Sequence, residues 1–155
     1  MFDWLLGAPL SVGSVAPDFR LRTDDGRSVT LSEFHGRQNV VLVFYPKDDT
    51  SLCTRQLCEF RDSWAAAAAA DTVVFGVNPG SEASHQTFRQ KFQLPYPLLV
   101  DEGQKVARLY GSQGLIVRRT VYLVGKSGLI RFAGRGVPKP AEVLAAAEVS
   151  QIEAV

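Results

Sequence analysis

The sequence has few cysteines, no excess of charge of either sign and no long apolar run, and each of these shortages excludes a class of protein. Two cysteines in 155 residues cannot form the disulfide framework of a small secreted domain. Seventeen basic side chains against sixteen acidic ones, spread along the chain, predict neither nucleic acid nor a lipid surface as the main partner. No apolar stretch approaches the roughly 18 residues that a membrane helix needs.

The beginning of the chain also lacks the features of a targeting segment. Residues 1–9 contain no basic side chain ahead of their short apolar run, unlike a secretory signal peptide. No polar linker divides the sequence between residues 17 and 150, so we expect one domain over residues 1–155. The sequence contains no strongly apolar surface strand of the kind that would indicate an obligate dimer. We therefore expect a monomeric, cytoplasmic domain whose two thiols are reactive or metal-binding rather than structurally paired.

Two apolar runs predict parallel strands joined by a helix. Residues 39–45 and 72–78 are continuous runs rich in β-branched and aromatic side chains, which is typical of strands buried on both faces. Between them, residues 51–70 predict a helix whose apolar stripe extends from Leu57 to Trp64 and which ends in a run of alanines. A strand, helix and strand in this order form a right-handed crossover.

The other expected elements add strands to the same sheet. In chain order they are a hairpin at residues 19–31, a helix capped by Ser81 that stops before Pro95, a short strand at 96–100, a short helix at 102–110, a hairpin at 120–132 and a closing helix at 140–149. This order predicts the α/β class and a thioredoxin-like fold: a central mixed sheet with one antiparallel edge, flanked by helices, with an N-terminal β-hairpin. The fold alone does not define the chemistry.

Cys53 lies where thiol chemistry is easiest in this architecture. It falls in the first turn of the helix that follows a central strand, where unpaired N–H groups and the positive end of the helix dipole favour a thiolate. The alternative is an inert cysteine that packs as a small hydrophobic side chain. The position at a helix start favours the reactive thiol.

Cys58 follows Cys53 by five residues on the same predicted helix. On an intact helix this spacing separates the two Cα atoms by roughly 8–9 Å, whereas a disulfide needs less than about 7 Å. A bridge between the two cysteines therefore requires the first helical turns to unwind. The alternative is a helix residue with no chemical role. A zinc site is disfavoured, because only His35 and His85 could complete it and neither has a recognised spacing to the thiols.

The segment around the cysteines resembles a known family. Residues 45–58 read Tyr-Pro-Lys-Asp-Asp-Thr-Ser-Leu-Cys-Thr-Arg-Gln-Leu-Cys, which contains the pattern Pro-x-x-x-Thr-x-x-Cys of the peroxidatic loop of peroxiredoxins. The Cys-x-x-x-x-Cys spacing within one helix resembles the bacterioferritin comigratory protein, or peroxiredoxin Q, subfamily. Four other segments also resemble the family and occur in the family order along the chain: residues 16–19, 30–32, 60–62 and 119–124. The resemblance covers roughly residues 13 to 149.

The resemblance implies a role for each reacting thiol. Cys53 would be the peroxidatic thiolate, which attacks a peroxide oxygen and becomes a sulfenic acid. Cys58 would be the resolving thiol, which condenses with that sulfenic acid to an intramolecular disulfide. Thioredoxin or a similar dithiol reductant would then reduce the disulfide. The implied activity is reduction of hydrogen peroxide and organic hydroperoxides, with no cofactor and no metal.

The resemblance also implies four supporting residues. Thr50 would place its hydroxyl between the sulfur and the peroxide, and Pro46 would shield the sulfur from water. Arg119 would favour the thiolate and hold the peroxide oxygens with its planar fork. Gln56 would support the arginine. One departure is that Ser-Leu replaces the Pro-Gly pair common before the peroxidatic cysteine, which would alter the rigidity of the loop.

Two other functions compete with a peroxidase. A thioredoxin-type oxidoreductase would carry Cys-x-x-Cys and a proline before the strand near residue 120, but the sequence has no proline between Pro97 and Pro138. A peroxide-sensing redox switch or binding module needs the same reactive thiol, so the motif leaves this alternative open. Turnover separates the two functions, since a sensor consumes about one equivalent of peroxide.

Overall fold

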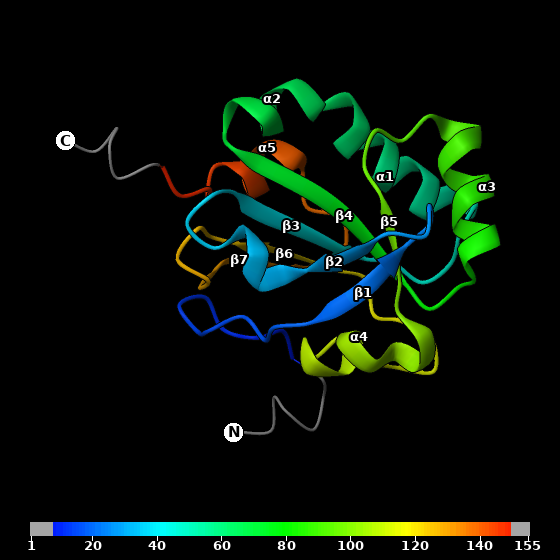
Figure 1. Cartoon of the computed structure of the whole chain (residues 1–155), viewed down its shortest axis with the longest axis horizontal. Helices are drawn as coiled ribbons and strands as arrows, with labels where there is room; N and C mark the ends of the chain where they lie inside the picture. Colours follow the sequence, from blue (N-terminus) through cyan, green and yellow to red (C-terminus); the bar gives the residue numbers. More distant parts are fainter. Residues whose placement is uncertain (1–7, 150–155) are drawn as a thin grey trace.

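The computed structural model describes residues 8–149; residues 1–7, most of the segment compared with a signal peptide, and residues 150–155 lie outside this range. Its elements form one seven-stranded sheet with helices on both faces (Figure 1). The strands are β1 (Arg20–Thr23), β2 (Ser28–Thr30), β3 (Asn39–Phe44), β4 (Thr72–Asn78), β5 (Leu98–Val100), β6 (Thr120–Val124) and β7 (Ile130–Arg135). The helices are α1 (Ser51–Asp62), α2 (Trp64–Ala69), α3 (Glu82–Phe92), α4 (Lys105–Leu109) and α5 (Pro140–Leu144), with 3-10 turns at η1 (Leu31–Phe34) and η2 (Glu102–Gln104).

The predicted crossover of two buried strands is confirmed. The strand order is β2-β1-β5-β4-β3-β6-β7, and β3 pairs in parallel with β4, so that Val41 lies opposite Val74. On its other side β3 pairs antiparallel with β6, which places Phe44 opposite Thr120. The carboxyl end of β3, from which the chain enters α1, therefore lies beside the first residue of β6.

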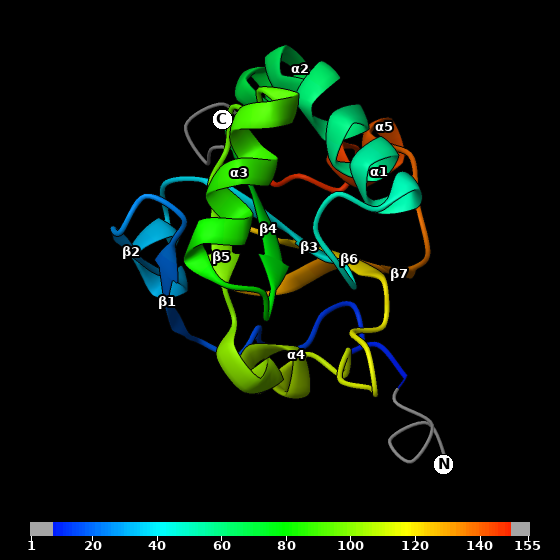
Figure 2. The same ribbon diagram turned by 90° about the vertical axis from the view of Figure 1, so that its right-hand side faces the viewer.

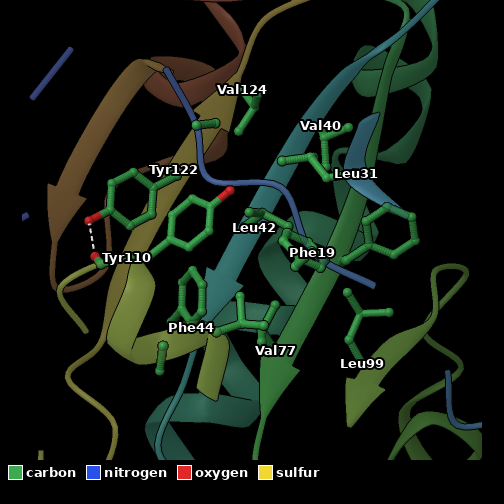
Figure 3. Close-up of a cluster of buried hydrophobic side chains, with 14 of the residues drawn as sticks. Phe19, Leu31, Val40, Leu42, Phe44, Val77, Leu99, Tyr110, Tyr122 and Val124 are labelled. Atoms are coloured by element: carbon green, nitrogen blue, oxygen red, sulfur yellow. Dashed lines mark hydrogen bonds between the residues drawn. The ribbon is translucent and has the colours of Figure 1, made fainter. Parts of the chain in front are cut away.

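Side chains of β3 alternate between two hydrophobic cores, as the period of a strand requires. Leu42 and Phe44 pack on the face covered by α4, where the rings of Tyr110 and Tyr122 lie edge to face with centroids 5.3 Å apart (Figure 3). Val41 packs on the opposite face, beneath α1, α2, α3 and α5 (Figure 1). The second core includes Cys53, so the candidate site is built on a packed face of the sheet.

Several element boundaries differ from the sequence-based expectation. The N-terminal hairpin joins the main sheet, because β1 pairs antiparallel with β5, and both edges of the sheet are therefore antiparallel rather than one. The strand expected at residues 96–100 begins at Leu98. The helix expected at residues 102–110 is divided into η2 and α4 because Gly103 and Gln104 both have positive φ, at 68° and 58°. No helix within residues 8–149 has the length and hydropathy to span a bilayer.

Two predicted helices are wrong in length. The helix expected over residues 51–70 is broken at Ser63, and the new direction of α2 lets Trp64 stack on Tyr96 at a centroid distance of 6.1 Å. The closing helix ends near Ala145 rather than at residue 149. Glu148 explains the early end, because its backbone N–H donates to Asn39 and its carbonyl accepts from the same side-chain amide. Both backbone groups are therefore committed to the sheet.

Candidate active site

The loop after β3 turns the chain into α1 and sets the position of Cys53. Pro46 follows the last buried residues of the strand, and Asp49 adopts a left-handed conformation with φ of 56°, which aspartate tolerates. Thr50 then occupies the N-cap in an extended conformation. Cys53 is the third residue of α1, where the backbone N–H groups have no partner within the helix. Its side chain is fully buried, and the structure contains it as a free thiol.

Arg119 reaches this sulfur from the start of β6. Its Nη2 lies 3.1 Å from Sγ of Cys53, and its Nη1 donates to Oε1 of Gln56 over 2.8 Å. Gln56 is itself fully buried and donates through Nε2 to the carbonyl of Gly136, 3.2 Å away. The guanidinium is therefore held in one orientation by a fixed amide, with one arm directed at the sulfur. A cation at this distance stabilises a thiolate.

Of the two neighbouring arginines, Arg119 is the one beside the thiol. Arg118 is exposed, its backbone N–H donates to the carbonyl of Ser112, and its own carbonyl accepts from Thr120. Arg135 on β7 donates to the Thr120 hydroxyl and to the Gly111 carbonyl, 2.8 Å away. The guanidinium of Arg135 thus holds the segment that leads into β6.

Thr50 and Pro46 lie on the loop that leads to Cys53, and the hydrogen bond of the Thr50 side chain is with the loop rather than with the sulfur. The Thr50 hydroxyl donates to the carbonyl of Lys47 over 3.0 Å, so its proton is committed to the loop. Its oxygen keeps lone pairs that can accept a further hydrogen bond. Pro46 is half-buried. The structure therefore brings Arg119 against Cys53 and Gln56 against Arg119, and it places Thr50 and Pro46 on the adjoining loop.

Cys58 remains separate from Cys53 in this structure. The two residues lie on one continuous helix, for which ideal geometry gives about 8.7 Å between their Cα atoms. That separation exceeds the reach of a disulfide, about 7 Å. Cys58 is half-buried, and burial raises the pKa of its thiol. The neighbouring carbonyl of Leu57 accepts a 2.5 Å hydrogen bond from the Tyr96 hydroxyl, which fixes this part of α1 to the rest of the fold.

A buried group of polar side chains behind the loop was not expected from the sequence. Asp48 accepts hydrogen bonds from the Tyr45 hydroxyl (2.5 Å) and the Ser84 hydroxyl (2.7 Å), and its Oδ2 lies 2.6 Å from Nδ1 of His85. His85 is fully buried in α3. In the sequence, His85 stood out only as a possible zinc ligand. Within residues 8–149 no cluster of three or more histidine, cysteine or acidic side chains could hold a metal ion.

The charges of this pair are set by their contacts. Burial disfavours the charged form of His85, but the hydrogen bond and the negative charge of Asp48 outweigh it, so the pKa of His85 lies above its ordinary 6.5. Burial alone would raise the pKa of Asp48, but hydrogen bonds from His85 and Tyr45 lower it below the usual carboxyl value. Both shifts favour the charged pair, in which Nδ1 of His85 donates to the Asp48 carboxylate.

We expect this ion pair to make stability depend on pH in a defined direction. The contribution of His85 is fully present below its unfolded pKa and is lost as pH rises through its higher folded pKa. Asp48 acts in the opposite sense, because its contribution is lost as pH falls through its lowered pKa. Urea unfolding from about pH 5 to about pH 9 should show a declining free energy on the alkaline side. His85→Gln should flatten that decline; an unchanged slope would contradict the charged pair.

The comparisons with known proteins agree with the fold and with the cysteine motif. The AhpC/TSA family model matches residues 12–133. "Peroxiredoxin Q, chloroplastic" of Oryza sativa subsp. japonica is 43% identical over 127 residues, which cover 79% of this chain and 58% of that protein. "Peroxiredoxin Bcp" of Bacillus subtilis (strain 168) is 38% identical over 128 residues, covering 77% of this chain and 81% of that protein. The chain thus spans 58% of the length of the rice relative and most of the bacterial one.

Solved structures give the same result. Peroxidoxin BcpB from Mycobacterium tuberculosis superimposes with a TM-score of 0.83 at 26% identity, covering 88% of this chain and 96% of that one. Peroxiredoxin Q from Xanthomonas campestris superimposes with a TM-score of 0.77 at 28% identity, covering 90% and 96%. The central strand, the helix start that carries the cysteine and the matched length of sequence all lead to one family. The chain belongs to the AhpC/TSA family and, within it, to the peroxiredoxins of the Q/Bcp subfamily.

Proposed function

We propose that the protein is a thiol-dependent peroxidase that reduces hydrogen peroxide and organic hydroperoxides through Cys53. The observation that carries the proposal is the contact between Nη2 of Arg119 and Sγ of Cys53 at the start of α1, with the guanidinium held by Gln56. A helix N-terminus and a fixed cation together favour the thiolate, which is the form of cysteine that attacks peroxides. Family membership supports the same activity.

In the first step the Cys53 thiolate attacks one oxygen of the peroxide. A sulfur–oxygen bond forms, the oxygen–oxygen bond breaks, and the departing oxygen takes up a proton to leave as water or an alcohol. Arg119 stabilises the thiolate and, through its fork, the oxygens whose charge increases as the bond breaks. Thr50, whose hydroxyl proton is donated to the Lys47 carbonyl, accepts a hydrogen bond from the peroxide, and Pro46 keeps water from the sulfur. The product on the protein is the sulfenic acid of Cys53.

In the second step Cys58 resolves the sulfenic acid. Its thiolate attacks the sulfur of Cys53, the disulfide forms and water leaves. The helical separation of the two cysteines requires the first turns of α1 to unwind beforehand. Unwinding also exposes Cys58 to water, which removes the burial that raises its pKa and so increases its thiolate fraction. A thioredoxin-type dithiol reductant then restores both thiols.

The count of turnovers tests this function against its main alternative. With an excess of peroxide and a dithiol protein as reductant, a peroxidase consumes many equivalents, whereas a redox switch consumes about one. We expect continuous consumption by the wild-type protein. Consumption that stops after a single equivalent, with the disulfide formed and the reductant present, would assign the chain to the redox-switch class instead.

Cys58→Ser should separate the two chemical steps. Because Cys53 and Arg119 are unchanged, we expect the variant to reduce about one equivalent of peroxide at the wild-type rate and then to accumulate sulfenic acid. Mass spectrometry after one equivalent should detect a Cys53–Cys58 disulfide in the wild type and none in the variant. Absence of that disulfide in the wild type would indicate a mechanism in which an external thiol resolves the sulfenic acid.

We also propose that the chain acts as a monomeric single domain in a thiol-reducing compartment such as the cytoplasm. Two cysteines that must return to the thiol form after each cycle require a source of reducing equivalents. Sedimentation of the reduced protein at working concentration tests the oligomeric state.

A further inference from the structure

A buried histidine lies directly behind the loop that leads to Cys53. His85 is fully buried, and acceptors face both of its ring nitrogens: Nδ1 lies 2.6 Å from the Asp48 carboxylate, and Nε2 lies 3.1 Å from the backbone carbonyls of Asn78 and Leu99. A neutral imidazole has one N–H and would turn a lone pair toward one of these oxygens. Opposite an ionised Asp48, only the doubly protonated ring donates from both nitrogens, and the contacts therefore favour the imidazolium.

Asp48 connects this cation to the active-site loop. The residue stands between β3 and α1, two positions before Thr50 and five before Cys53. Its carboxylate accepts from the hydroxyl of Tyr45, the last buried residue before the loop, and from the hydroxyl of Ser84 on α3. Three donors on two separate elements therefore hold one loop carboxylate. An ionised carboxylate in such a setting has a single low-energy position.

The surrounding backbone is shaped to allow this cluster. Asn78, at the end of β4, donates to the carbonyl of Tyr45 over 2.7 Å and accepts from the N–H of Gly80 at the same distance. A Cβ on Gly80 would lie 2.8 Å from the Asn78 side-chain oxygen and 3.2 Å from Cε1 of His85. The end of β4 thus packs so closely against the ring that a larger residue at position 80 would displace it.

The loop has a second attachment to α3, and this one is weak. Asp49 pairs with Lys91 over 2.9 Å, but the two side chains are 46% and 57% exposed. Exposed pairs of this kind contribute little to stability. The Asp48–His85 pair is by contrast 6% and 0% exposed. The buried pair is therefore the fixed point of the loop. Helices α1 and α3 lie on the same face of the sheet (Figure 2).

We propose that His85 is a positioning residue for the peroxide reaction: its buried imidazolium fixes Asp48 and so holds the 46–50 loop and the first turn of α1 where Cys53 meets Arg119. This inference rests on the proposed peroxidase function. If the loop is released, the site is correctly assembled for only a fraction of the time, and the rate constant for peroxide falls to that fraction of its original value. Disulfide formation requires the same turn to leave its place, so release of the loop does not slow that step.

Stopped-flow fluorescence of Trp64, which stacks on Tyr96 beside Cys58, can follow the two steps separately. His85→Gln should reduce the second-order rate constant for peroxide about tenfold or more, while the first-order rate constant for disulfide formation stays equal or rises. Arg89→Gln is the matched control. It breaks another largely buried ion pair of α3, with Asp24 at 3.1 Å, which has no contact with the loop, and it should leave both rate constants unchanged.

A milder variant keeps the test valid if His85→Gln folds poorly. Ser84→Ala removes one hydrogen bond to Asp48 from an exposed position and should lower the peroxide rate constant by about twofold to fivefold, again without slowing disulfide formation. Equal losses in both steps, or the same loss in the Arg89→Gln control, would overturn the proposal. A wild-type protein that fails to react with peroxide would reject the proposed function instead, so the two failures are distinguishable.

Discussion

Cys53→Ser is expected to abolish peroxide consumption, with a fall in rate of at least about 1,000-fold, as when other covalent enzymes lose their nucleophile. A serine hydroxyl stays protonated where a thiol ionises, and an oxygen nucleophile does not form the sulfenic acid on which the cycle depends. The substitution is nearly isosteric. It keeps the buried position between α1 and the sheet, so the fold and the contact network of Arg119 and Gln56 should persist.

The measurement is peroxide loss in the presence of a dithiol reductant, with the unfolding midpoint recorded for each variant. Cys58→Ser serves as the control, because it also replaces a thiol of α1 but leaves the attacking sulfur in place. The Cys53 variant should show neither turnover nor a first equivalent, while the Cys58 variant retains the first equivalent. If Cys53→Ser consumed peroxide at the wild-type rate, the assignment of the reacting thiol would be wrong.

The burial of Cys53 explains why its partners matter so much. A thiolate with no exposed surface has no water to stabilise it, so its charge must be balanced by protein groups. Helix α1 supplies partial positive charge at its start and β6 supplies Arg119. The same burial separates Cys53 from Cys58, because a packed helix turn must open before the second thiol arrives. The reaction with peroxide therefore requires the first turn of α1 to stay folded, whereas formation of the disulfide requires the same turn to unwind.

The sequence predicted the parts of the fold that local pattern determines. The two apolar runs became β3 and β4 because their residues pack on both faces, and the hairpin at residues 120–132 became β6 and β7. The position of Cys53 at a helix start followed from the strand that precedes it. The resemblance to peroxiredoxins pointed to Arg119 and Gln56, and in the structure Arg119 contacts the sulfur while Gln56 accepts a hydrogen bond from Arg119. Their chemical roles stay predictions.

What the sequence did not reveal depends on contacts between distant segments. The alanine run after Trp64 favours an unbroken helix. The structure instead breaks the helix at Ser63, and the indole ring of Trp64 stacks on Tyr96, a residue 32 positions further along the chain. From the sequence, Asp48 belongs to a polar loop and His85 was considered only as a possible zinc ligand. Their pairing, 37 positions apart, exists because α3 packs against the loop after β3. No hydrophobic periodicity or short motif in the sequence indicates such a pair.

Arg119→Met is expected to lower the second-order rate constant for peroxide by about 100-fold or more, the usual cost of removing one preorganised donor from a developing charge. The methionine fills part of the volume of the arginine but offers no hydrogen bond to Sγ of Cys53, which lies 3.1 Å from Nη2 in the intact site. Stopped-flow fluorescence measures this rate constant.

Two further substitutions separate the charge of Arg119 from its orientation. Arg119→Lys keeps a positive charge but has no fork, so it should retain only a small part of the wild-type peroxide reactivity. Gln56→Leu keeps the guanidinium and removes the amide that accepts from its Nη1 over 2.8 Å; the expected loss is smaller, about fivefold. A methionine variant with wild-type peroxide reactivity would show that the helix start alone activates Cys53. A lysine variant with full reactivity would show that charge suffices and that two-point binding of the peroxide is not required.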